Sequence, residues 1–498
     1  MNGRRLTRWR PTTAAARAIP GITSVVVCVS ACAIGPQYVP PAVSVPPAFK
    51  EVAAWKPAQP NDQALRGKWW EIFGDPQLNA LEEQLSVSNN TVRAAQAQFD
   101  QARALVRGAR AATLPAVGAV ASGARTSQSE NRSSPSANPD FTTYLLRFDA
   151  AYEADVWGRI RQTIRATRAS AQAGAADLES VNLSLHAELA VDYFLLRALD
   201  AEKEIFDSSV AAYERALELT RSRYQGGVAS GVDVAQAEAQ LESTRTQAID
   251  NQLTRAQLEH AIAVLLGRPA SSFSVPAVPL DVAVPAVGPG LPAELLERRP
   301  DIAGAERRLA AASAEIGIAA TAFYPVLALT GTTGVESAAL GRWLRLASNF
   351  WSIAPAAAVA VFDGGRRRAV SEQARAEYAM TEALYRETVL VAFREVEDNL
   401  AALRSLEEEA TTQAAAITAA DRVLTLATNR YRGGVTTYLE VVIAQSALLN
   451  SQRAGMSILA RRLTETVLLI KALGGGWEIS RQNAVHGQTT RPLAVNWP

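Results

Sequence analysis

The stretch RYQGGVASGVDVAQAEAQL, from Arg223 to Leu241, recurs as RYRGGVTTYLEVVIAQSAL from Arg430 to Leu448. The offset of 207 residues holds outside this stretch as well, since Glu188 corresponds to Glu395. Self-similarity over so long a period indicates a duplicated structural unit rather than a solenoid of short repeats. Each copy is predicted to contain a helix, two strands, a very long helix and a further helix.

Each copy has a very long helix that ends at a pair of glycines. The sequence has no proline from Arg159 to about Tyr224, nor from about Arg366 to Tyr431. At 1.5 Å per residue, helices of this length would span roughly 100 Å. Another helical segment follows each glycine pair, and paired glycines allow the left-handed backbone of a tight reversal. We therefore predict two helical hairpins, with turns at Gly226, Gly227, Gly433 and Gly434.

The clearest strand runs from Phe141 to Trp157, where apolar and polar residues alternate with period two. Its polar face carries Arg147, Asp149 and Glu153, and its opposite face is apolar. Other strands are expected at about Thr113–Arg125, Thr321–Gly334 and Asn349–Phe362, and a single helix is expected at Leu78–Ala112.

Four strands per chain constrain how these strands could enter a membrane. Every backbone N–H and C=O must be paired within lipid, so an open sheet edge is excluded there. Membrane barrels begin near eight strands, so several chains would have to share one barrel. Eight strands need a dimer and twelve a trimer, and geometry does not choose between them. In such a barrel Arg147, Asp149 and Glu153 would face a wet lumen. The alternative is a periplasmic coiled-coil protein with a small soluble β domain.

The N-terminus has the composition of a targeting segment. Five arginines precede an apolar stretch from Ile22 to Val29, and Val29-Ser30-Ala31-Cys32 follows. This order is typical of a bacterial signal peptide that ends at a lipidated cysteine. The alternative is a plain signal followed by a free cysteine. Ala33 after the cysteine favours retention in the outer membrane.

Removal of this segment changes the charge and the redox chemistry of the chain. The net charge falls from +1 to −4, and no basic tract suited to nucleic acid remains. Cys28 is lost with the signal, so the mature chain keeps a single cysteine and can form no internal disulfide. The longest apolar runs are too short for a transmembrane helix.

The predicted organisation has six parts. They are a lipoprotein signal peptide at 1–31, a lipid-anchored tether and entry segment at 32–75, a first repeat at 76–266, a connecting equatorial segment at 267–299, a second repeat at 300–473 and a C-terminal tail at 474–498.

Catalytic and metal-binding chemistry is not indicated. The three histidines, His186, His260 and His486, lack metal-ligand spacing to one another or to cysteine. The chain has no nucleophile elbow and no phosphate-binding loop. We therefore expect no enzyme activity, no metal and no cofactor other than a covalent lipid on Cys32.

Several motifs in the expected order resemble outer-membrane factor lipoproteins of the TolC family, in its NodT branch. They are GPQYVPP after Cys32, DVWGRIR from Asp155, the stretch from Arg298 to Gly331, FDGGRRRA from Phe362 and ALGGGW from Ala472. The resemblance implies a mainly α-helical homotrimer with one shared twelve-stranded membrane β-barrel in outer-membrane lipid. It also implies a periplasmic coiled-coil tunnel, docking to a periplasmic adaptor (a membrane fusion protein), and an inner-membrane pump of the resistance-nodulation-division type.

The same resemblance places a gate at the hairpin ends. It implies that Asp233 is an acidic partner, that Tyr431 links to it and that Arg430 flanks this tyrosine. Leu439 would form an apolar ring and Glu440 an acidic one. Ile443 stands where relatives commonly have an aspartate, and Thr436 where one has a linking arginine. An alternative explanation for Asp233 and Glu440 is helix capping, since acids are favoured at helix N-termini.

These features together predict the exit duct of a tripartite efflux pump in the outer membrane of a Gram-negative bacterium. The duct would conduct small molecules passively and close at its periplasmic mouth. Two alternatives stay open from the sequence: the outer-membrane channel of a type I protein secretion system, and a periplasmic coiled-coil adaptor.

Overall fold

The structure is a computed structural model that describes residues 34–43, 45–51, 67–129, 140–280, 282–288, 295–296 and 298–475. The chain divides into two compact units. The first comprises Met1–Tyr38, Arg107–Ala166 and Ser313–Ala376, and the second comprises Val39–Val106, Thr167–Ala312 and Glu377–Pro498. Each unit takes segments from both sequence copies, so the duplicated halves are interleaved in the fold.

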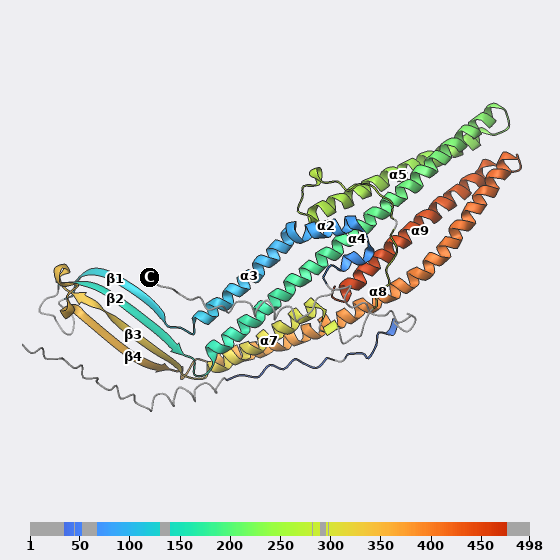
Figure 1. The fold of residues 1–498 in the computed structure, drawn as a ribbon. Coiled ribbons are helices and arrows are strands. Elements are labelled where there is room, and N and C mark those ends of the chain that lie inside the picture. Colours follow the sequence, from blue (N-terminus) through green and yellow to red (C-terminus); the bar gives the residue numbers. More distant parts are fainter. Residues whose placement is uncertain are drawn as a thin grey trace, which may run out of the picture. The chain divides into compact units, whose positions relative to one another are not determined.

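The first unit contains a four-stranded antiparallel sheet in the order β1-β2-β3-β4 (Figure 1). The strands are β1 (Ala116–Ser127), β2 (Asp140–Ala154), β3 (Val326–Ser337) and β4 (Asn349–Ala358). The strand register joins the two copies, because Phe148 of β2 lies opposite Thr333 of β3. One face of the sheet is therefore built from alternate residues of all four strands.

The alternation of polar and apolar residues in β2 predicts which residues lie on the charged face of the sheet and which lie on the apolar face. Arg147, Asp149 and Glu153 share one face, and Phe148 and Ala150 lie on the other. Trp351 and Ile353 of β4 lie in the rows of Phe148 and Ala150 and so join the apolar face. The prediction for β3 begins too early, because α7 (Pro300–Thr321) extends to Thr321 and β3 starts only at Val326. The segment before Pro325 is rich in alanine, and nothing in its composition breaks a helix sooner.

Two helical hairpins run through the chain. α4 (Arg159–Gln225) is followed by α5 (Gly231–Leu265), and α8 (Arg366–Arg432) is followed by α9 (Tyr438–Ala472) (Figure 1). The predicted bounds of α4 and α8 are right to within one residue at each end. No helix among the described residues is both long enough and apolar enough to span a bilayer.

The helix predicted at Leu78–Ala112 is interrupted at Asn89. It forms α2 (Pro76–Ser88) and α3 (Asn90–Ala111), and Asn89 has an extended backbone. The buried Asn89 amide donates to the carbonyl of Leu265 at 2.7 Å and its oxygen accepts from the N–H groups of Thr91 and Val92. This side chain therefore caps α3 and ties it to the end of α5. The contact is tertiary, so the continuous helix was a reasonable but wrong prediction.

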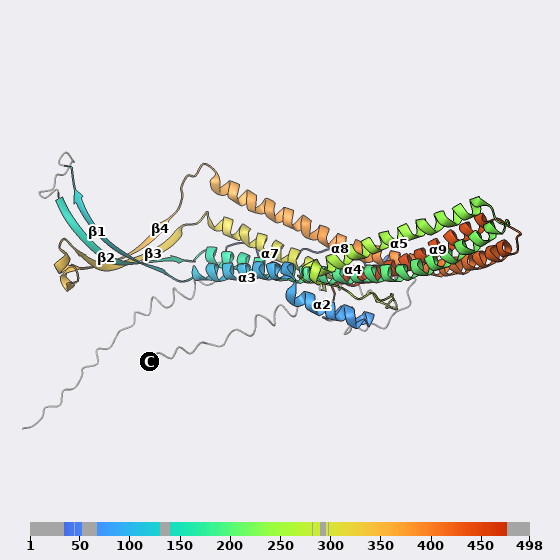
Figure 2. The ribbon, with the colours of Figure 1, turned by 90° about the horizontal axis from the view of Figure 1, so that it is seen from above.

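The main core of the second unit lies where α2, α4, α5, α8 and α9 meet the entry segment (Figure 2). Trp69, Trp70 and Phe73 of the short turn η3 (Trp69–Phe73) are buried in it. A seam of side chains spaced three and four residues apart is also buried, with Val389, Val396, Leu400 and Leu403 from α8 and Leu189, Tyr193 and Leu196 from α4. Three further 3-10 turns are η4 (Ala270–Ser272), η5 (Leu340–Arg342) and η6 (Leu346–Ser348).

Within the second unit, a buried ion network fastens the connecting segment to α4 and α5. Asp200 of α4 accepts hydrogen bonds from Arg197 Nη1 at 3.1 Å, from Arg255 Nε at 2.6 Å and from the N–H of Val278 at 3.2 Å. Arg197 also donates to the carbonyl of Pro276 at 2.6 Å. The polar atoms of a chain without regular structure are thus satisfied by α4 and α5.

Candidate functional site: the tips of the two helical hairpins

Both hairpins turn by the same backbone mechanism. The N–H of Val228 bonds to the carbonyl of Arg223 at 2.8 Å, and the N–H of Gly227 bonds to Tyr224 at 2.9 Å. The second tip repeats this pair of bonds with Val435 and Gly434. These are Schellman motifs, in which the residue after the helix takes a left-handed backbone. Only the second glycine of each pair does so, with φ of 73° at Gly227 and 75° at Gly434.

Asp233 links the two tips. Its carboxylate and Ser230 form a capping box at the start of α5, in which Asp233 Oδ2 accepts from the N–H of Ser230 at 2.9 Å. The other oxygen, Oδ1, accepts from the N–H of Tyr438 at 3.3 Å. Tyr438 is the first residue of α9, and Thr437 before it makes no side-chain cap. One carboxylate therefore accepts hydrogen bonds at the N-termini of two helices. Asp233 caps α5, as the alternative explanation proposed, and it also joins the two hairpins.

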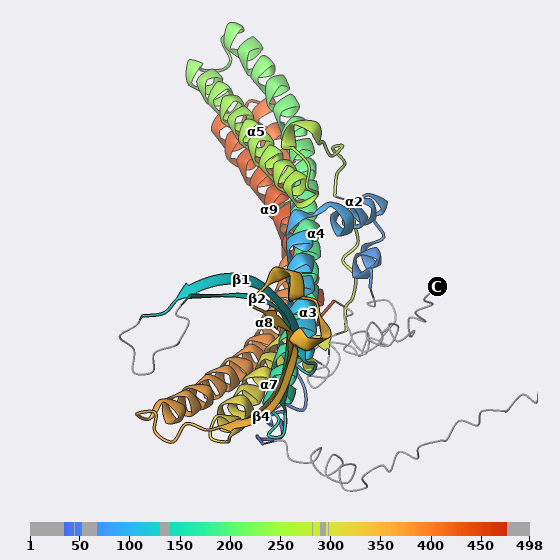
Figure 3. The same cartoon turned by 90° about the vertical axis from the view of Figure 1, so that its left-hand side faces the viewer.

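The link at Asp233 begins a regular seam between α5 and α9 (Figure 3). Seven residues further along α5, Gln240 Oε1 accepts from Ser446 at 3.1 Å. Another seven residues on, Gln247 Oε1 accepts from Arg453 at 3.2 Å. A spacing of seven keeps these side chains on one side of α5, as in a left-handed coiled coil. Polar contacts thus hold the two hairpins in register.

Tyr431 lies in a small core that both tips share. It is 4% exposed, and its ring meets that of Tyr438 edge-on at 5.2 Å. Its hydroxyl lies 3.4 Å from that of Thr220, and among the described residues no hydrogen bond joins it to Asp233. Tyr213 donates to the carbonyl of Gln445 at 3.1 Å in the same core. Burial raises the pKa of Tyr438 to about 12, so its phenol stays neutral at physiological pH.

The duplicated arginines make different contacts. Arg223 of the first copy reaches across to the second, where Nη1 donates to the carbonyl of Arg432 at 3.0 Å and the guanidinium lies 4.9 Å from the centre of the Tyr431 ring. Its counterpart Arg430 pairs with Glu440 at 3.3 Å within its own hairpin, and both side chains are about half exposed. Glu440 corresponds to Asp233 in the duplication, so the two copies use equivalent positions differently.

Large apolar side chains are exposed at the tip of α9. Leu439 is 47% exposed and Ile443, one turn later, is 61% exposed. The neighbouring Val441 and Ala444 are buried in the tip core. Leu439 and Ile443 therefore share the face of α9 that points away from the chain's own core. In the first copy Val232, which corresponds to Leu439, is also exposed.

The charged face of β2 forms its own set of contacts in the first unit. Arg147 Nε donates to Asp149 at 2.9 Å, and Thr332 of β3 donates to the other oxygen of Asp149 at 2.9 Å. Glu153 accepts two bonds from Arg159, at 2.8 and 2.7 Å. The three predicted lumen residues are thus brought together with partners on one face, and their orientation toward a lumen stays a prediction.

Two other predictions concern binding chemistry. Among the described residues no group of His, Cys, Asp and Glu side chains could hold a metal ion. Cys32, the signal peptide and His486 lie outside the described residues, so the lipid anchor stays a prediction.

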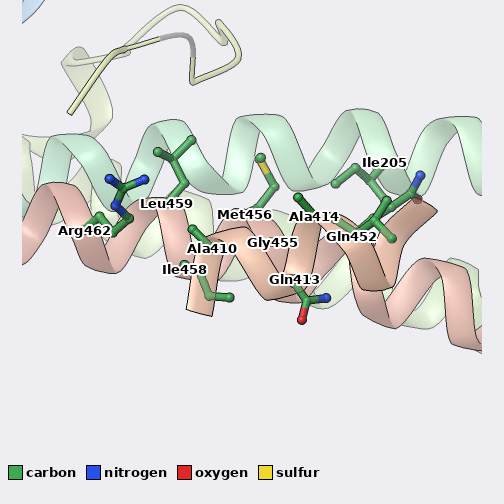
Figure 4. Close-up of a pocket in the computed structure, with 11 residues that line it drawn as sticks. Ile205, Ala410, Gln413, Ala414, Gln452, Gly455, Met456, Ile458, Leu459 and Arg462 are labelled. Carbon is green, nitrogen blue, oxygen red and sulfur yellow. The ribbon is translucent and has the colours of Figure 1, made fainter. Parts of the chain in front are cut away.

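A hollow of about 390 Å³ lies between α4, α8 and α9 (Figure 4). Ile205, Ile417 and Met456 line it, and Arg462 is the single charged residue among its lining side chains. A Cβ at Gly455 would lie 3.0 Å from Ile417 Cδ1, so this glycine permits close helix packing. The hollow lacks the convergent polar groups of a catalytic pocket.

Sequence reasoning gave no inter-hairpin role to Arg223, Thr220, Tyr213 or Tyr438. Arg223 could have been noticed as the counterpart of Arg430 at the offset of 207. Tyr438 had no signal, because it contributes a backbone N–H and its counterpart in the first copy is Gly231.

Comparison with known proteins agrees with this architecture. The family described as outer membrane efflux protein matches residues 81–268 and 291–475, which together form most of the chain. The chain belongs to this family.

Two relatives from Pseudomonas are similar to this chain over nearly their whole length. The toluene efflux pump outer membrane protein TtgC of Pseudomonas putida is 32% identical over 90% of this chain and 93% of its own. OprJ of Pseudomonas aeruginosa is 30% identical over 94% of this chain and 98% of its own. The solved structure of the outer-membrane channel OprN superimposes with a TM-score of 0.82 at 30% identity, covering 90% of this chain and all of OprN.

The predicted TolC-like fold and efflux function are therefore confirmed. As a member of the outer membrane efflux protein family, the chain is the outer-membrane component of an efflux pump in a Gram-negative bacterium and extends into the periplasm. The family consists of channel proteins rather than enzymes. The alternatives of a type I secretion channel and a periplasmic adaptor are not supported by these relatives.

Proposed function

We propose that the chain acts as a homotrimer that conducts small toxic molecules passively and closes at its hairpin tips. The four strands of each chain would contribute to one twelve-stranded barrel, because a single four-stranded sheet leaves two edges unpaired. Arg147, Asp149 and Glu153 would line the wet interior of this barrel. A lipid on Cys32 would anchor each chain to the outer membrane.

The observation that carries the gate is the exposure of Leu439 and Ile443 on one face of α9. Side chains of this size stabilise an assembly by roughly 1.5–3 kcal/mol each when they become fully buried. The exposed Arg430–Glu440 pair is worth only about 0–1 kcal/mol, because water screens it. Apolar packing of Leu439 and Ile443 around the axis therefore exceeds the contribution of charge in closing the mouth.

The partners follow from the class of pump. A passive duct needs an energised inner-membrane transporter, and a periplasmic adaptor must bridge the two. We propose a resistance-nodulation-division pump as the transporter. The relatives named for toluene, solvent and antibiotic efflux support small, mostly apolar molecules as the cargo. Cross-linking in cells followed by co-purification would identify the adaptor and the pump.

Single-channel conductance of the full chain in planar bilayers tests the gate. Leu439→Ala and Ile443→Ala should raise the open probability, and Glu440→Gln should change it little. Val87→Ala is the matched control, since Val87 is an exposed valine of α2 away from the tips. An open channel in Glu440→Gln but not in Ile443→Ala would show that charge, and not packing, closes the mouth.

A further inference from the structure

A hollow of about 240 Å³ lies in the second unit beside the end of α9. It is lined by apolar and polar side chains, among them Trp70, Val92, Leu183, Ser86, Asn182 and His186. Gly475, after which the described chain ends, lines it as well. The chain therefore leaves the described part of the structure at a wall of this hollow. An apolar cavity of about 150 Å³ admits a benzene molecule, so the hollow is large enough for one aromatic side chain.

Two successive glycines direct the chain along this wall. α9 ends on the motif seen at the hairpin tips, since the N–H of Gly475 bonds to the carbonyl of Ile470 at 3.0 Å and that of Gly474 to Lys471 at 2.9 Å. This motif needs one left-handed residue, which Gly474 supplies with φ of 91°. Gly475 is left-handed too, with φ of 57°, and a Cβ there would overlap Leu183 Cδ1. Only glycine therefore fits position 475 against this lining residue.

The first copy shows that the helix end itself does not require the second glycine. At the offset of 207, Gly267 corresponds to Gly474 and Arg268 to Gly475. α5 ends with the same pair of backbone bonds, made by the N–H groups of Gly267 and Arg268. Because an arginine completes the motif there, the left-handed Gly475 serves the chain that follows it. After α5 the following chain returns an aromatic side chain, Phe273, to the main core.

The sequence after α9 supplies an aromatic side chain within reach of the hollow. It continues with Gly476 and Trp477, which lie outside the described residues. The Cα of Trp477 is at most about 7 Å from that of Gly475, because two residues of extended chain span no more. An indole has an apolar body and one N–H donor. These match a lining of apolar side chains among which Ser86 and Asn182 offer side-chain oxygens as acceptors.

We propose that the indole of Trp477 occupies this hollow and fastens the C-terminal tail to α4 and the entry segment. The docked segment would bring backbone carbonyls to Trp70, whose Nε1 is buried and has no hydrogen-bond partner among the described residues. Buried polar groups are normally paired, so this donor is accounted for by an acceptor from the tail. The inference concerns the second unit alone and does not depend on the barrel, the lipid anchor or the gate.

Thiol labelling of the full-length protein tests the site. Ser86→Cys places a thiol on the wall of the hollow, where the described chain leaves Ser86 exposed. With Trp477 docked, a maleimide should react slowly at position 86. Trp477→Ala should raise this rate at least about tenfold, because burial of a large aromatic side chain favours the docked state by such a factor. Trp477→Phe should keep most of the protection, since a phenyl ring still fills much of the hollow.

Trp497→Ala is the matched control, because it makes the same change further along the same tail and should leave the labelling of position 86 unchanged. Val87→Cys controls the reagent, since Val87 is 82% exposed and lies outside the hollow. Mass spectrometry reads the label on the α2 peptide, and circular dichroism checks that each variant keeps its helices. Rapid labelling of position 86 beside an unchanged tail would overturn the inference. Slow labelling that persists in Trp477→Ala would overturn it too, by showing that another segment or another copy covers the hollow.

Discussion

The carboxylate of Asp233, in the first hairpin, accepts a hydrogen bond from the backbone N–H of Tyr438, the first residue of the last helix in the second hairpin. The same carboxylate completes the capping box of its own helix. The equivalent residue of the second copy, Glu440, pairs with Arg430 instead. The tips are therefore joined by an asymmetric contact, in which the first copy supplies the acceptor and the second supplies the donor.

Replacement of Asp233 should loosen both helix ends. Asp233→Ala removes two capping interactions, each worth about 1 kcal/mol, and leaves the Tyr438 N–H without its acceptor. We expect a lower thermal unfolding midpoint and a higher basal conductance. Asp233→Asn keeps an oxygen acceptor. Its unfolding midpoint and its basal conductance should lie between those of Asp233→Ala and those of the unchanged protein. Glu440→Gln, at the equivalent position of the second copy, is the control and should leave the midpoint nearly unchanged, because its partner is an exposed arginine.

A buried acid–base pair in the second unit should make stability depend on pH. Glu82 of α2 is fully buried and its Oε2 lies 2.5 Å from Nδ1 of His186, on which Trp70 stacks. Burial lowers the pKa of His186 to about 4 and raises the pKa of Glu82 well above its ordinary 4.5. Burial therefore favours the uncharged form of both side chains, in which the Glu82 carboxyl donates to Nδ1 of His186.

His186 and Glu82 change the stability of the protein with pH in opposite directions. His186 contributes stability that is present above its unfolded pKa of 6.5 and is lost as the pH falls toward 4, by roughly 3 kcal/mol at 1.36 kcal/mol per unit. Glu82 contributes stability that is present below 4.5 and is lost as the pH rises. Between about pH 4.5 and 6.5 the two slopes therefore oppose each other, so stability should change little with pH in this window and fall with acid below it through His186 and with alkali above it through Glu82.

Denaturant titrations across this pH range check the pair. His186→Phe, which installs the residue found at the equivalent Phe393, should abolish the loss on the acid side. Glu82→Gln should abolish the loss on the alkaline side and keep a hydrogen bond to Nδ1. Unchanged pH profiles in both variants would mean that the pair titrates identically in the folded and unfolded chain.

Asp200 should be among the most sensitive positions for stability. Its side chain is 2% exposed and accepts bonds from two arginines and from the backbone of the connecting segment. Asp200→Ala leaves Arg197 buried without its counter-charge, which costs roughly 3–5 kcal/mol. Chemical denaturation measures this loss. Asp398→Ala is the control, because Asp398 is exposed and its contact with Arg394 is long, at 3.9 Å; its effect should stay within about 0.5 kcal/mol.

The long helices and the strand faces were predictable because their determinants are local. Absence of proline and the paired glycines define α4 and α8, and period-two alternation defines the face that carries Arg147 and Asp149. The break at Asn89 was not predictable, because its bond partner, Leu265, is 176 residues away. A helix former in its place would have continued the helix.

The gate could be predicted only in part. The resemblance placed Asp233, Leu439 and Ile443 near the tips, and the structure does so as well. It implied a link between Asp233 and Tyr431, which stays a prediction; within the described chain Tyr431 contacts Thr220, Tyr438 and Arg223. The acceptor of Asp233 is used by a backbone N–H, which any residue at position 438 except proline would provide. Such a contact leaves no signature in a sequence.

The N-terminus of α9 is capped by a residue of the other hairpin, which makes the two halves of the chain unequal. Ser230 and Asp233 can finish the end of the first hairpin with residues of that hairpin alone. Thr437 makes no such bond, so the end of α9 is complete only when a residue some 205 positions earlier is already in place. The duplicated halves are therefore not interchangeable, since the earlier half supplies the acceptor that completes the end of the later one.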